Sequence, residues 1–334
     1  MTQRQRTRVR RIPPADRTAM NPLPGPSPQH PSTPGSDPAP APGANGGNFS
    51  RRTLLHATAA TGVALGLTAT LRAIPAQAAG GTGGTHELGH GRPRKSTIVL
   101  AHGAFAESSS WDDVVTILQR RGHRVVSVAV PLRGVATDSR YLSDVVATLD
   151  GPVVLVGHSY GGAVISNTDR TAGDIRALVY VAAFAGEVGE SCAELSGKFP
   201  GSTLGTTLTF VDLATGGRDL YIDQDKYHHQ FCADVSDRKA AQMATSQRPI
   251  AESALAEPFG PDPLWKTIPS WFIWGEIDYN IPAQAHAFMA DRAGAHTAIE
   301  VPGASHVVGV THPERTAGVI AAAARATQRS GGAS

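Results

Sequence analysis

The segment Gly157-His158-Ser159-Tyr160-Gly161 has the residue types of a turn that presents a nucleophilic serine. An apolar, β-branched run over residues 152–156 precedes it, as a buried parallel strand requires, and a small and then apolar run follows it, as a tightly packed helix requires. The two outer glycines remove Cβ atoms that would collide in so sharp a reversal. This context predicts that the hydroxyl of Ser159 stands above a sheet at the amino end of a helix. A chance match in a glycine-rich chain is the alternative.

A serine nucleophile needs a histidine as its base, and the chain contains 13 histidines. His306 follows the last predicted strand, in a loop that opens at the carboxyl edge of the sheet, where the serine turn also points. His312 directly precedes a proline at a predicted helix start, which favours a structural role. His102 and His158 flank the site and suit packing or supporting roles. We therefore expect His306 to be the base.

The acid that orients the histidine is expected in Trp274-Gly275-Glu276-Ile277-Asp278, at the end of the preceding predicted strand. Glu276 and Asp278 could both serve, and Glu187 or Glu190, which follow an earlier strand, offer a third route. The chain order serine, acid, histidine agrees with either carboxylate of the segment. The residues alone leave this choice open.

An acyl-transfer site also needs two backbone N–H groups that stabilise an oxyanion. Tyr160, directly after the serine, is expected to supply the first. The stretch Ala101-His102-Gly103-Ala104-Phe105 ends the first predicted strand, and Gly103 lets its backbone approach closely. The N–H of Ala104 is therefore the second candidate, and a simple tight turn at this point is the alternative.

Alternating strand-like and helix-like runs, from residue 96 to about residue 328, predict the elements that position these residues. The predicted strands are 97–101, 124–130, 152–156, 176–184, 270–274 and 297–301, and the predicted helices are 110–121, 141–149, the one after the serine, 283–293 and 313–326. Such connections indicate an α/β domain with a doubly wound, mostly parallel sheet that binds ligands at the carboxyl ends of its strands.

Residues 186–268 are too many for one loop of a compact domain. Helical patterns cover residues 190–198 and 239–246, and turn residues at 214–217 predict a hairpin. Five aromatic residues favour a small packed cap over the sheet edge: Phe199, Phe210, Tyr221, Tyr227 and Phe231. A mobile insertion without bearing on activity is the alternative.

The first 78 residues differ in charge and composition from the rest. They hold nine arginines and two aspartates, which leaves 21 basic and 26 acidic residues in the remainder of a chain whose net charge is +2. The remainder is therefore net negative, which argues against nucleic acid as a partner. Residues 1–49 are rich in proline and are predicted to be disordered, and residues 79–95 are predicted to be a flexible, glycine-rich linker.

Residues 50–78 resemble a twin-arginine export signal. Arg51-Arg52 precedes a mild apolar run that ends at Leu71, and Ala76-Gln77-Ala78 is similar to a cleavage site. We expect the twin-arginine export machinery to act on the precursor, with cleavage after Ala78 and secretion of the product. A single membrane anchor is the alternative, since the run has about the minimum spanning length.

Cys192 and Cys232 are the only cysteines, and both fall in the predicted cap. Two thiols within reach tend to pair in the oxidising compartment that an exported protein enters. We therefore expect a disulfide that ties the start of the cap to its middle, with two buried free thiols as the alternative.

With Ser159, His306, the carboxylate segment and the early loop in place, residues 96–326 resemble the α/β-hydrolase family. Residues 102–105 and 157–161 are similar to those of small carboxylesterases near the plant methylesterases and hydroxynitrile lyases. The family pattern places the acid three residues after the glycine, which selects Asp278. The resemblance implies a serine hydrolase that cleaves small, largely apolar carboxylic esters through an acyl-enzyme, without cofactor or metal.

Two positions depart from the hydroxynitrile lyases of that branch. Those lyases have a threonine where this chain has Gly103 and a lysine after the catalytic histidine, where this chain has Val307. We therefore rank a lyase reaction below hydrolysis of a small-molecule ester. A non-catalytic ligand-binding protein on the same fold is the third interpretation, and the physiological substrate and the oligomeric state are beyond the sequence.

Overall fold

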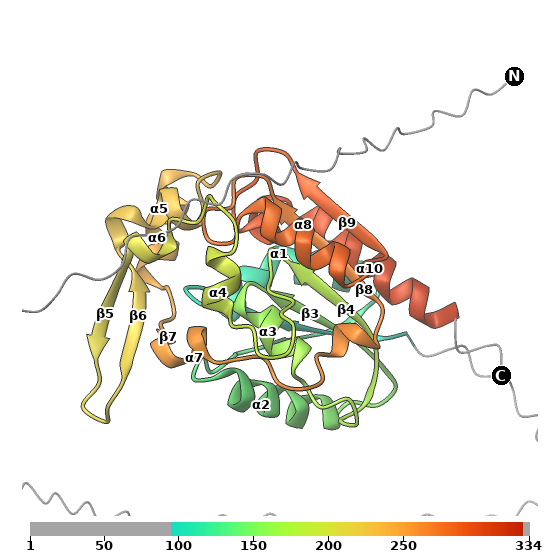
Figure 1. The fold of residues 1–334 in the computed structure, drawn as a ribbon. Coiled ribbons are helices and arrows are strands. Elements are labelled where there is room, and N and C mark those ends of the chain that lie inside the picture. The colour runs from blue at the N-terminus through green and yellow to red at the C-terminus, as the bar shows by residue number, and fades with distance from the viewer. Residues whose placement is uncertain (1–94, 330–334) are drawn as a thin grey trace, which may run out of the picture. The chain divides into compact units, whose positions relative to one another are not determined.

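A six-stranded parallel sheet forms the centre of the fold in a computed structural model that describes residues 95–329 (Figure 1). Its strands, in spatial order, are β2 (Arg124–Val128), β1 (Thr97–Ala101), β3 (Pro152–His158), β4 (Asp174–Val181), β8 (Ser270–Gly275) and β9 (Thr297–Val301). The chain runs outward from β1 in one direction and from β3 in the other, so the carboxyl ends of β1 and β3 meet at a switch point where ligands bind in such sheets. The predicted fold class is confirmed.

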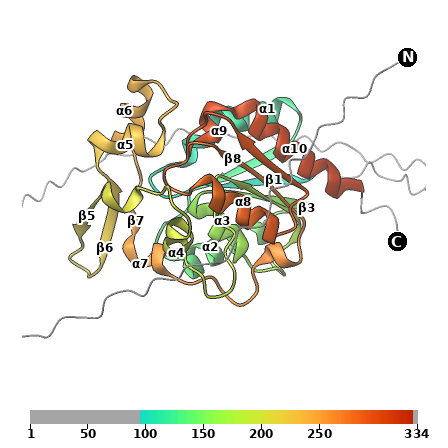
Figure 2. The same cartoon turned by 45° about the horizontal axis from the view of Figure 1, so that its top comes forward.

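Helices cover both faces of the sheet, which is why its central strands are continuous buried apolar runs (Figure 2). One face carries α1 (Asp112–Arg120) and α10 (Pro313–Arg329), and the other carries α2 (Val135–Ala147), α3 (Tyr160–Ser166) and α8 (Ala283–Arg292). Short helical segments join these elements: η1 (Ser108–Trp111), η3 (Leu264–Lys266) and α9 (Val308–Thr311). In the described residues, no helix is both long and apolar enough to span a bilayer.

Helix α2 begins at Val135, six residues before the start predicted from the sequence. The carboxylate of Glu257 explains the early start, because its oxygen atoms accept hydrogen bonds from the N–H groups of Val135 (2.6 Å) and Ala136 (3.0 Å). The first N–H groups of a helix have no partner within the helix. Here a residue more than one hundred positions away supplies the partner, which no local pattern reports.

The insertion between β4 and β8 folds into helices and strands that form a cap. It contains α4 (Cys192–Gly197), η2 (Leu204–Thr206), β5 (Leu208–Asp212), β6 (Arg218–Ile222), α5 (Gln224–Phe231), α6 (Asp237–Thr245), β7 (Ile250–Ala251) and α7 (Glu252–Ala256). The two predicted helices and the hairpin are confirmed, whereas α5, β7 and α7 were not predicted. Tyr227 and Phe231 are buried as expected, but Phe210 is 55% exposed on the projecting hairpin, where the Arg218 guanidinium covers its ring.

The predicted disulfide is wrong, because Cys192 and Cys232 are both free. Both thiols are buried, and burial raises the pKa of Cys232 to about 12 and that of Cys192 above its ordinary range. The two residues are therefore protonated, apolar packing residues of the cap.

The predicted leader (1–49) and export signal (50–78) lie outside the described residues, as does the predicted linker (79–95) apart from Lys95.

Candidate active site

Ser159 occupies the sharp turn between β3 and α3 that the sequence predicts. Its backbone has φ 52° and ψ −122°, a left-handed conformation that is strained for a residue with a side chain. The N–H of Ser159 donates to the carbonyl of Ala182 at 3.1 Å, which holds the turn against β4. A Cβ on Gly157 would stand 2.5 Å from the carbonyl oxygen of Gly161, so only glycine permits the reversal.

Asp278 and His306 meet at the carboxyl ends of β8 and β9, two neighbouring strands. The Nδ1–H of His306 donates to Oδ2 of Asp278 at 2.7 Å, and both residues are buried. Oδ1 of Asp278 accepts from the N–H groups of Asn280 (2.8 Å) and Ile281 (2.9 Å). A carboxylate in this position fixes the tautomer of the imidazole and leaves Nε2 of His306 free to accept a proton.

Asp278 carries its negative charge although it is buried. Burial by itself would raise the pKa of this carboxyl, but the interaction with His306 and the hydrogen bonds from His286 and His306 outweigh it and hold the pKa well below the ordinary value.

The other carboxylates considered from the sequence lie elsewhere. Glu276 is exposed and accepts a hydrogen bond from the N–H of Gly303 at 2.9 Å. Glu187 pairs with Lys266, and Glu190 pairs with Arg292. Of the four candidates, the structure brings only Asp278 to His306.

Ser159 and His306 line the same cavity, but no hydrogen bond joins the hydroxyl of Ser159 to His306. Nε2 of His306 is buried and has no hydrogen-bond partner among residues 95–329. Such a bond is commonly long or poorly aligned in a free enzyme and tightens when substrate binds.

The loop after β1 lies close to Ser159, and the sequence predicts such a close approach from Gly103. A Cβ on Gly103 would stand 2.5 Å from Cβ of Ser159, so a glycine is needed at this position. Ala104 and Tyr160 line the cavity beside Ser159. The hydroxyl of Tyr160 donates to Asp138 at 3.0 Å, which anchors the first residue of α3 to α2.

The histidines that flank the site have fixed structural partners. His102 donates through Nδ1 to the carbonyl of Gly103 (2.9 Å) and accepts at Nε2 from the N–H of Val130 (3.0 Å), so it is neutral, and burial lowers its pKa. His158 donates through Nε2 to the carbonyl of His306 at 3.1 Å, and burial lowers its pKa to about 3. Both side chains support the loops that carry the site.

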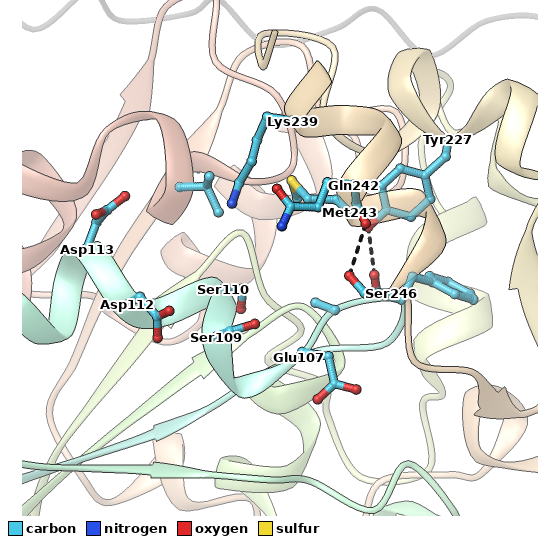
Figure 3. A pocket seen from close by; sticks show the side chains of 13 residues that line it. Glu107, Ser109, Ser110, Asp112, Asp113, Tyr227, Lys239, Gln242, Met243 and Ser246 are labelled. Atoms are coloured by element: carbon cyan, nitrogen blue, oxygen red, sulfur yellow. Dashed lines mark hydrogen bonds between the residues drawn. The ribbon is translucent and has the colours of Figure 1, made fainter. Parts of the chain in front are cut away.

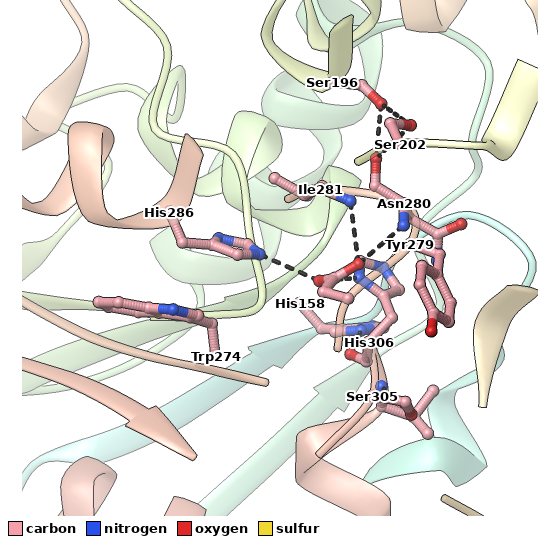
Figure 4. Close-up of polar contacts among 12 residues, drawn as sticks. His158, Ser196, Ser202, Trp274, Tyr279, Asn280, Ile281, His286, Ser305 and His306 are labelled. Atoms are coloured by element: carbon pink, nitrogen blue, oxygen red, sulfur yellow. Dashed lines mark hydrogen bonds and ion pairs between the residues drawn. The ribbon is translucent and has the colours of Figure 1, made fainter. Parts of the chain in front are cut away.

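The structure adds one histidine that the sequence reasoning missed. His286 on α8 is buried, and its Nε2–H donates to Oδ2 of Asp278 at 3.0 Å, the same oxygen that binds His306. Its ring stacks on Trp274 with 5.8 Å between the ring centroids (Figure 4). The only signal in the sequence is a histidine eight residues after Asp278 among the apolar positions of a predicted helix.

The cavity at Ser159 has a volume of about 170 Å³ and lies between the sheet and the cap. No lysine, arginine, aspartate or glutamate lines it within the described part of the chain. Most of its wall is apolar, including Phe105, Phe184, Leu204, Phe231, Leu255 and Ile281. Residues 95–329 contain no cluster of histidine, cysteine and carboxylate side chains that could hold a metal ion.

A second, more polar pocket of about 270 Å³ lies between η1 and α1 of the core and α6 of the cap (Figure 3). Glu107, Asp112 and Asp113 lie on one side of it, and Lys239 and Gln242 lie on the other. No histidine lines it, so it lacks the serine–base pair of the cavity at Ser159.

Solved structures share this fold. Polyneuridine aldehyde esterase has a TM-score of 0.57 at 18% identity over 69% of this chain and 99% of its own. A pyrethroid hydrolase structure has a TM-score of 0.56 at 23% identity over 69% of this chain and 98% of its own.

Several relatives of this chain are named as esterases or hydrolases. The pyrethroid hydrolase of Sphingobium wenxiniae is 28% identical over 246 residues, which cover 67% of this chain and 86% of the relative. The carbendazim hydrolyzing esterase of a Nocardioides strain is 37% identical over 116 residues, which cover 31% of this chain and 48% of the relative. Methylesterase 2 of Arabidopsis thaliana is 28% identical over 157 residues, covering 41% of this chain and 60% of the relative.

The sequence model of the alpha/beta hydrolase family matches residues 98–319 of this chain. This range includes the serine turn, the carboxylate segment and the histidine loop. Together with the parallel sheet and its cap, this match shows that the chain belongs to the alpha/beta hydrolase family.

Proposed function

We propose that this protein, a carboxylic ester hydrolase of its family, cleaves small, largely apolar esters with Ser159 as nucleophile, His306 as base and Asp278 as orienting acid. One observation carries the proposal: His306, which is hydrogen-bonded to the buried carboxylate of Asp278, lines the same cavity as a serine held in a strained turn. The apolar wall of that cavity supports the preference for apolar esters.

In the first half of the reaction, Nε2 of His306 takes the proton of Ser159 while Oγ bonds to the ester carbonyl carbon. The N–H groups of Ala104 and Tyr160 donate to the carbonyl oxygen as it becomes negative. The imidazolium then gives its proton to the alcohol oxygen as the bond to the acyl carbon breaks, which leaves an acyl-enzyme. Asp278 remains ionised throughout and stabilises the imidazolium.

In the second half, His306 takes a proton from water as the water oxygen attacks the acyl carbon. The proton returns to Oγ of Ser159 as the carboxylic acid leaves. The two steps consume one ester and one water and give one acid and one alcohol.

The names of the relatives, a pyrethroid hydrolase, a carbendazim hydrolyzing esterase and a methylesterase, support an ester or a closely related acyl compound as the substrate. A lyase reaction has less support, because a side chain on residue 103 would collide with Ser159 and because Val307, not a lysine, follows His306.

The test is hydrolysis of a 4-nitrophenyl ester series by the protein and by Ser159→Ala, with a fluorophosphonate probe as an independent label. We expect the variant to stay folded, to lose roughly 10⁴-fold in kcat/KM and to lose labelling. Ser109→Ala, an exposed serine in the polar pocket, is the matched control. Near-normal turnover by Ser159→Ala would end the assignment.

A further inference from the structure

One polar group in the cavity takes no part in the chemistry proposed for Ser159. Asn280 is 4% exposed and lines the cavity together with Ser159 and His306. Its side-chain nitrogen Nδ2 is buried and has no hydrogen-bond partner among residues 95–329. A buried amide donor without a partner costs stability, so its presence in a binding cavity needs an explanation.

The orientation of this amide follows from a backbone carbonyl. Nε2 of Gln230 donates to the carbonyl oxygen of Tyr279 at 2.8 Å, and a carbonyl can only accept, so this end of Gln230 is its NH₂ group. The same Nε2 donates to Oδ1 of Asn280 at 2.9 Å. Oxygen therefore faces Gln230, and Nδ2 is the end of the Asn280 amide left unpaired.

The backbone of Asn280 is held on both sides. Its N–H donates to Oδ1 of Asp278 at 2.8 Å, and its carbonyl accepts from the hydroxyl groups of Ser196 (2.6 Å) and Ser202 (3.0 Å) (Figure 4). Asn280 lies in the same turn after β8 as Asp278, and we call this turn the triad turn. Its bonds to Asp278 and to the cap thus fix the position from which the amide extends. Thr203 in turn donates to Oε1 of Gln230 at 2.7 Å and holds that side chain.

We propose that Nδ2 of Asn280 is a recognition donor, and that the substrate carries a neutral hydrogen-bond acceptor, such as an ether, ketone or hydroxyl oxygen, in addition to the ester that is cleaved. This rests on the proposed ester hydrolysis at Ser159. A neutral acceptor fits because no lysine or arginine lines the cavity to pair with an anionic one. A plain alkyl ester would bury the donor unsatisfied.

The test compares 4-nitrophenyl esters in pairs of equal length, in which one methylene of the acyl chain is replaced by an ether oxygen at successive positions. Each kcat/KM is divided by the rate of hydroxide-catalysed hydrolysis of the same ester, which removes differences in intrinsic reactivity. For one position of the oxygen, we expect the oxygenated ester to be preferred by on the order of 10-fold.

Two variants test whether Asn280 is the source of that preference. Asn280→Asp keeps the shape and still accepts the Gln230 hydrogen bond, but it has no donor, and Asn280→Leu removes both polar groups. Both should bring the ratio for the preferred pair to about one. Leu204→Ala, which shortens an apolar wall residue, should change both members of the pair alike and leave the ratio unchanged. A flat ratio at every position in the parent protein, or a preference that survives in both variants, would overturn the proposal.

Binding of the same ester pairs to Ser159→Ala, measured by calorimetry, separates this inference from the proposed function. Preferential binding of the oxygenated ester that is lost when Asn280→Asp is added supports the recognition donor whether or not the parent protein turns the ester over. Fast hydrolysis together with equal binding of both esters rejects the Asn280 role and leaves the nucleophile assignment intact.

Discussion

Asp278 binds two histidines through one oxygen atom, since His306 donates to Oδ2 at 2.7 Å and His286 donates to it at 3.0 Å. Burial lowers the pKa of His286 although the hydrogen bond to Asp278 opposes this, so His286 is a neutral donor at pH 7. A neutral donor holds the carboxylate in place and takes up part of its charge. His286 therefore acts on the reaction through Asp278 and is a positioning residue.

Replacing His286 should change the pH profile as well as the rate. The titratable groups that surround it are Asp278, His306 and Glu300. In His286→Leu, Asp278 loses one donor and its charge acts more fully on the imidazolium of His306, so the acidic limb of kcat/KM should move to higher pH. We also expect kcat to fall about 10-fold, because the carboxylate is less well oriented.

His286→Gln, which keeps a donor, should restore the position of the acidic limb. The measurement is kcat/KM from pH 4 to 9 for the three proteins. A profile in His286→Leu that coincides with that of the parent protein would show that the histidine only fills space.

The choice between two carboxylates of one short segment is tested by a pair of amide substitutions. Asp278→Asn should reduce kcat by about 10³–10⁴-fold, because the amide disturbs the tautomer of His306 that leaves Nε2 free. Glu276→Gln should retain nearly full activity, since Glu276 is exposed and accepts only from the N–H of Gly303. The comparison uses kcat for the same ester at pH 7, and the opposite ranking would transfer the role to Glu276.

At the scale of elements, the cap and the core share hydrogen bonds that neither could form alone. Glu257, at the end of the cap, accepts from the first N–H groups of α2, and α2 in turn holds Tyr160 through Asp138. Ser196 and Ser202 of the cap donate to Asn280 in the triad turn. Folding of the cap is thereby coupled to the geometry of the catalytic loops.

Removing the Glu257 carboxylate should cost stability. Glu257→Ala leaves the N–H groups of Val135 and Ala136 without their acceptor, and we expect the free energy of unfolding to fall by about 1–2 kcal/mol. The control is Glu252→Ala, an exposed carboxylate on α7. Urea unfolding followed by circular dichroism measures both, and equal stability of the two variants would contradict the capping role.

For the whole molecule, the sequence predicts features formed within one segment, such as strands and turns. It does not predict most contacts between segments that lie far apart in the chain. The alternation of strand-like and helix-like runs predicts β1, β8 and β9 almost to the residue, and glycines between an apolar run and a small-residue run identify the turn at Ser159. The approach of the carboxylate segment to the loop of His306 was also predictable, because carboxyl ends of parallel strands meet at one edge of a sheet. The choice of Asp278 within that segment came from the family resemblance.

His286 and the pair of Gln230 with Asn280 were not predictable in the same way. Each contact depends on which face of a helix, α8 of the core or α5 of the cap, lies against the triad turn. The pattern of residues within one segment does not predict that orientation. The disulfide between Cys192 and Cys232 was predicted wrongly for a related reason, since a shared compartment says nothing about the distance between two buried thiols.

Export is the prediction that concerns the whole chain, and we propose that the twin-arginine pathway secretes this protein. Replacing Arg51 and Arg52 by lysine should hold the precursor inside the cell, because that pathway reads the arginine pair ahead of the apolar run. Arg10 and Arg11 form a matched control, since they are also adjacent but precede a proline-rich stretch, and their replacement should leave secretion unchanged. N-terminal sequencing of the secreted protein should begin at Ala79, whereas a product that keeps the apolar run and sediments with membranes would establish the anchor instead.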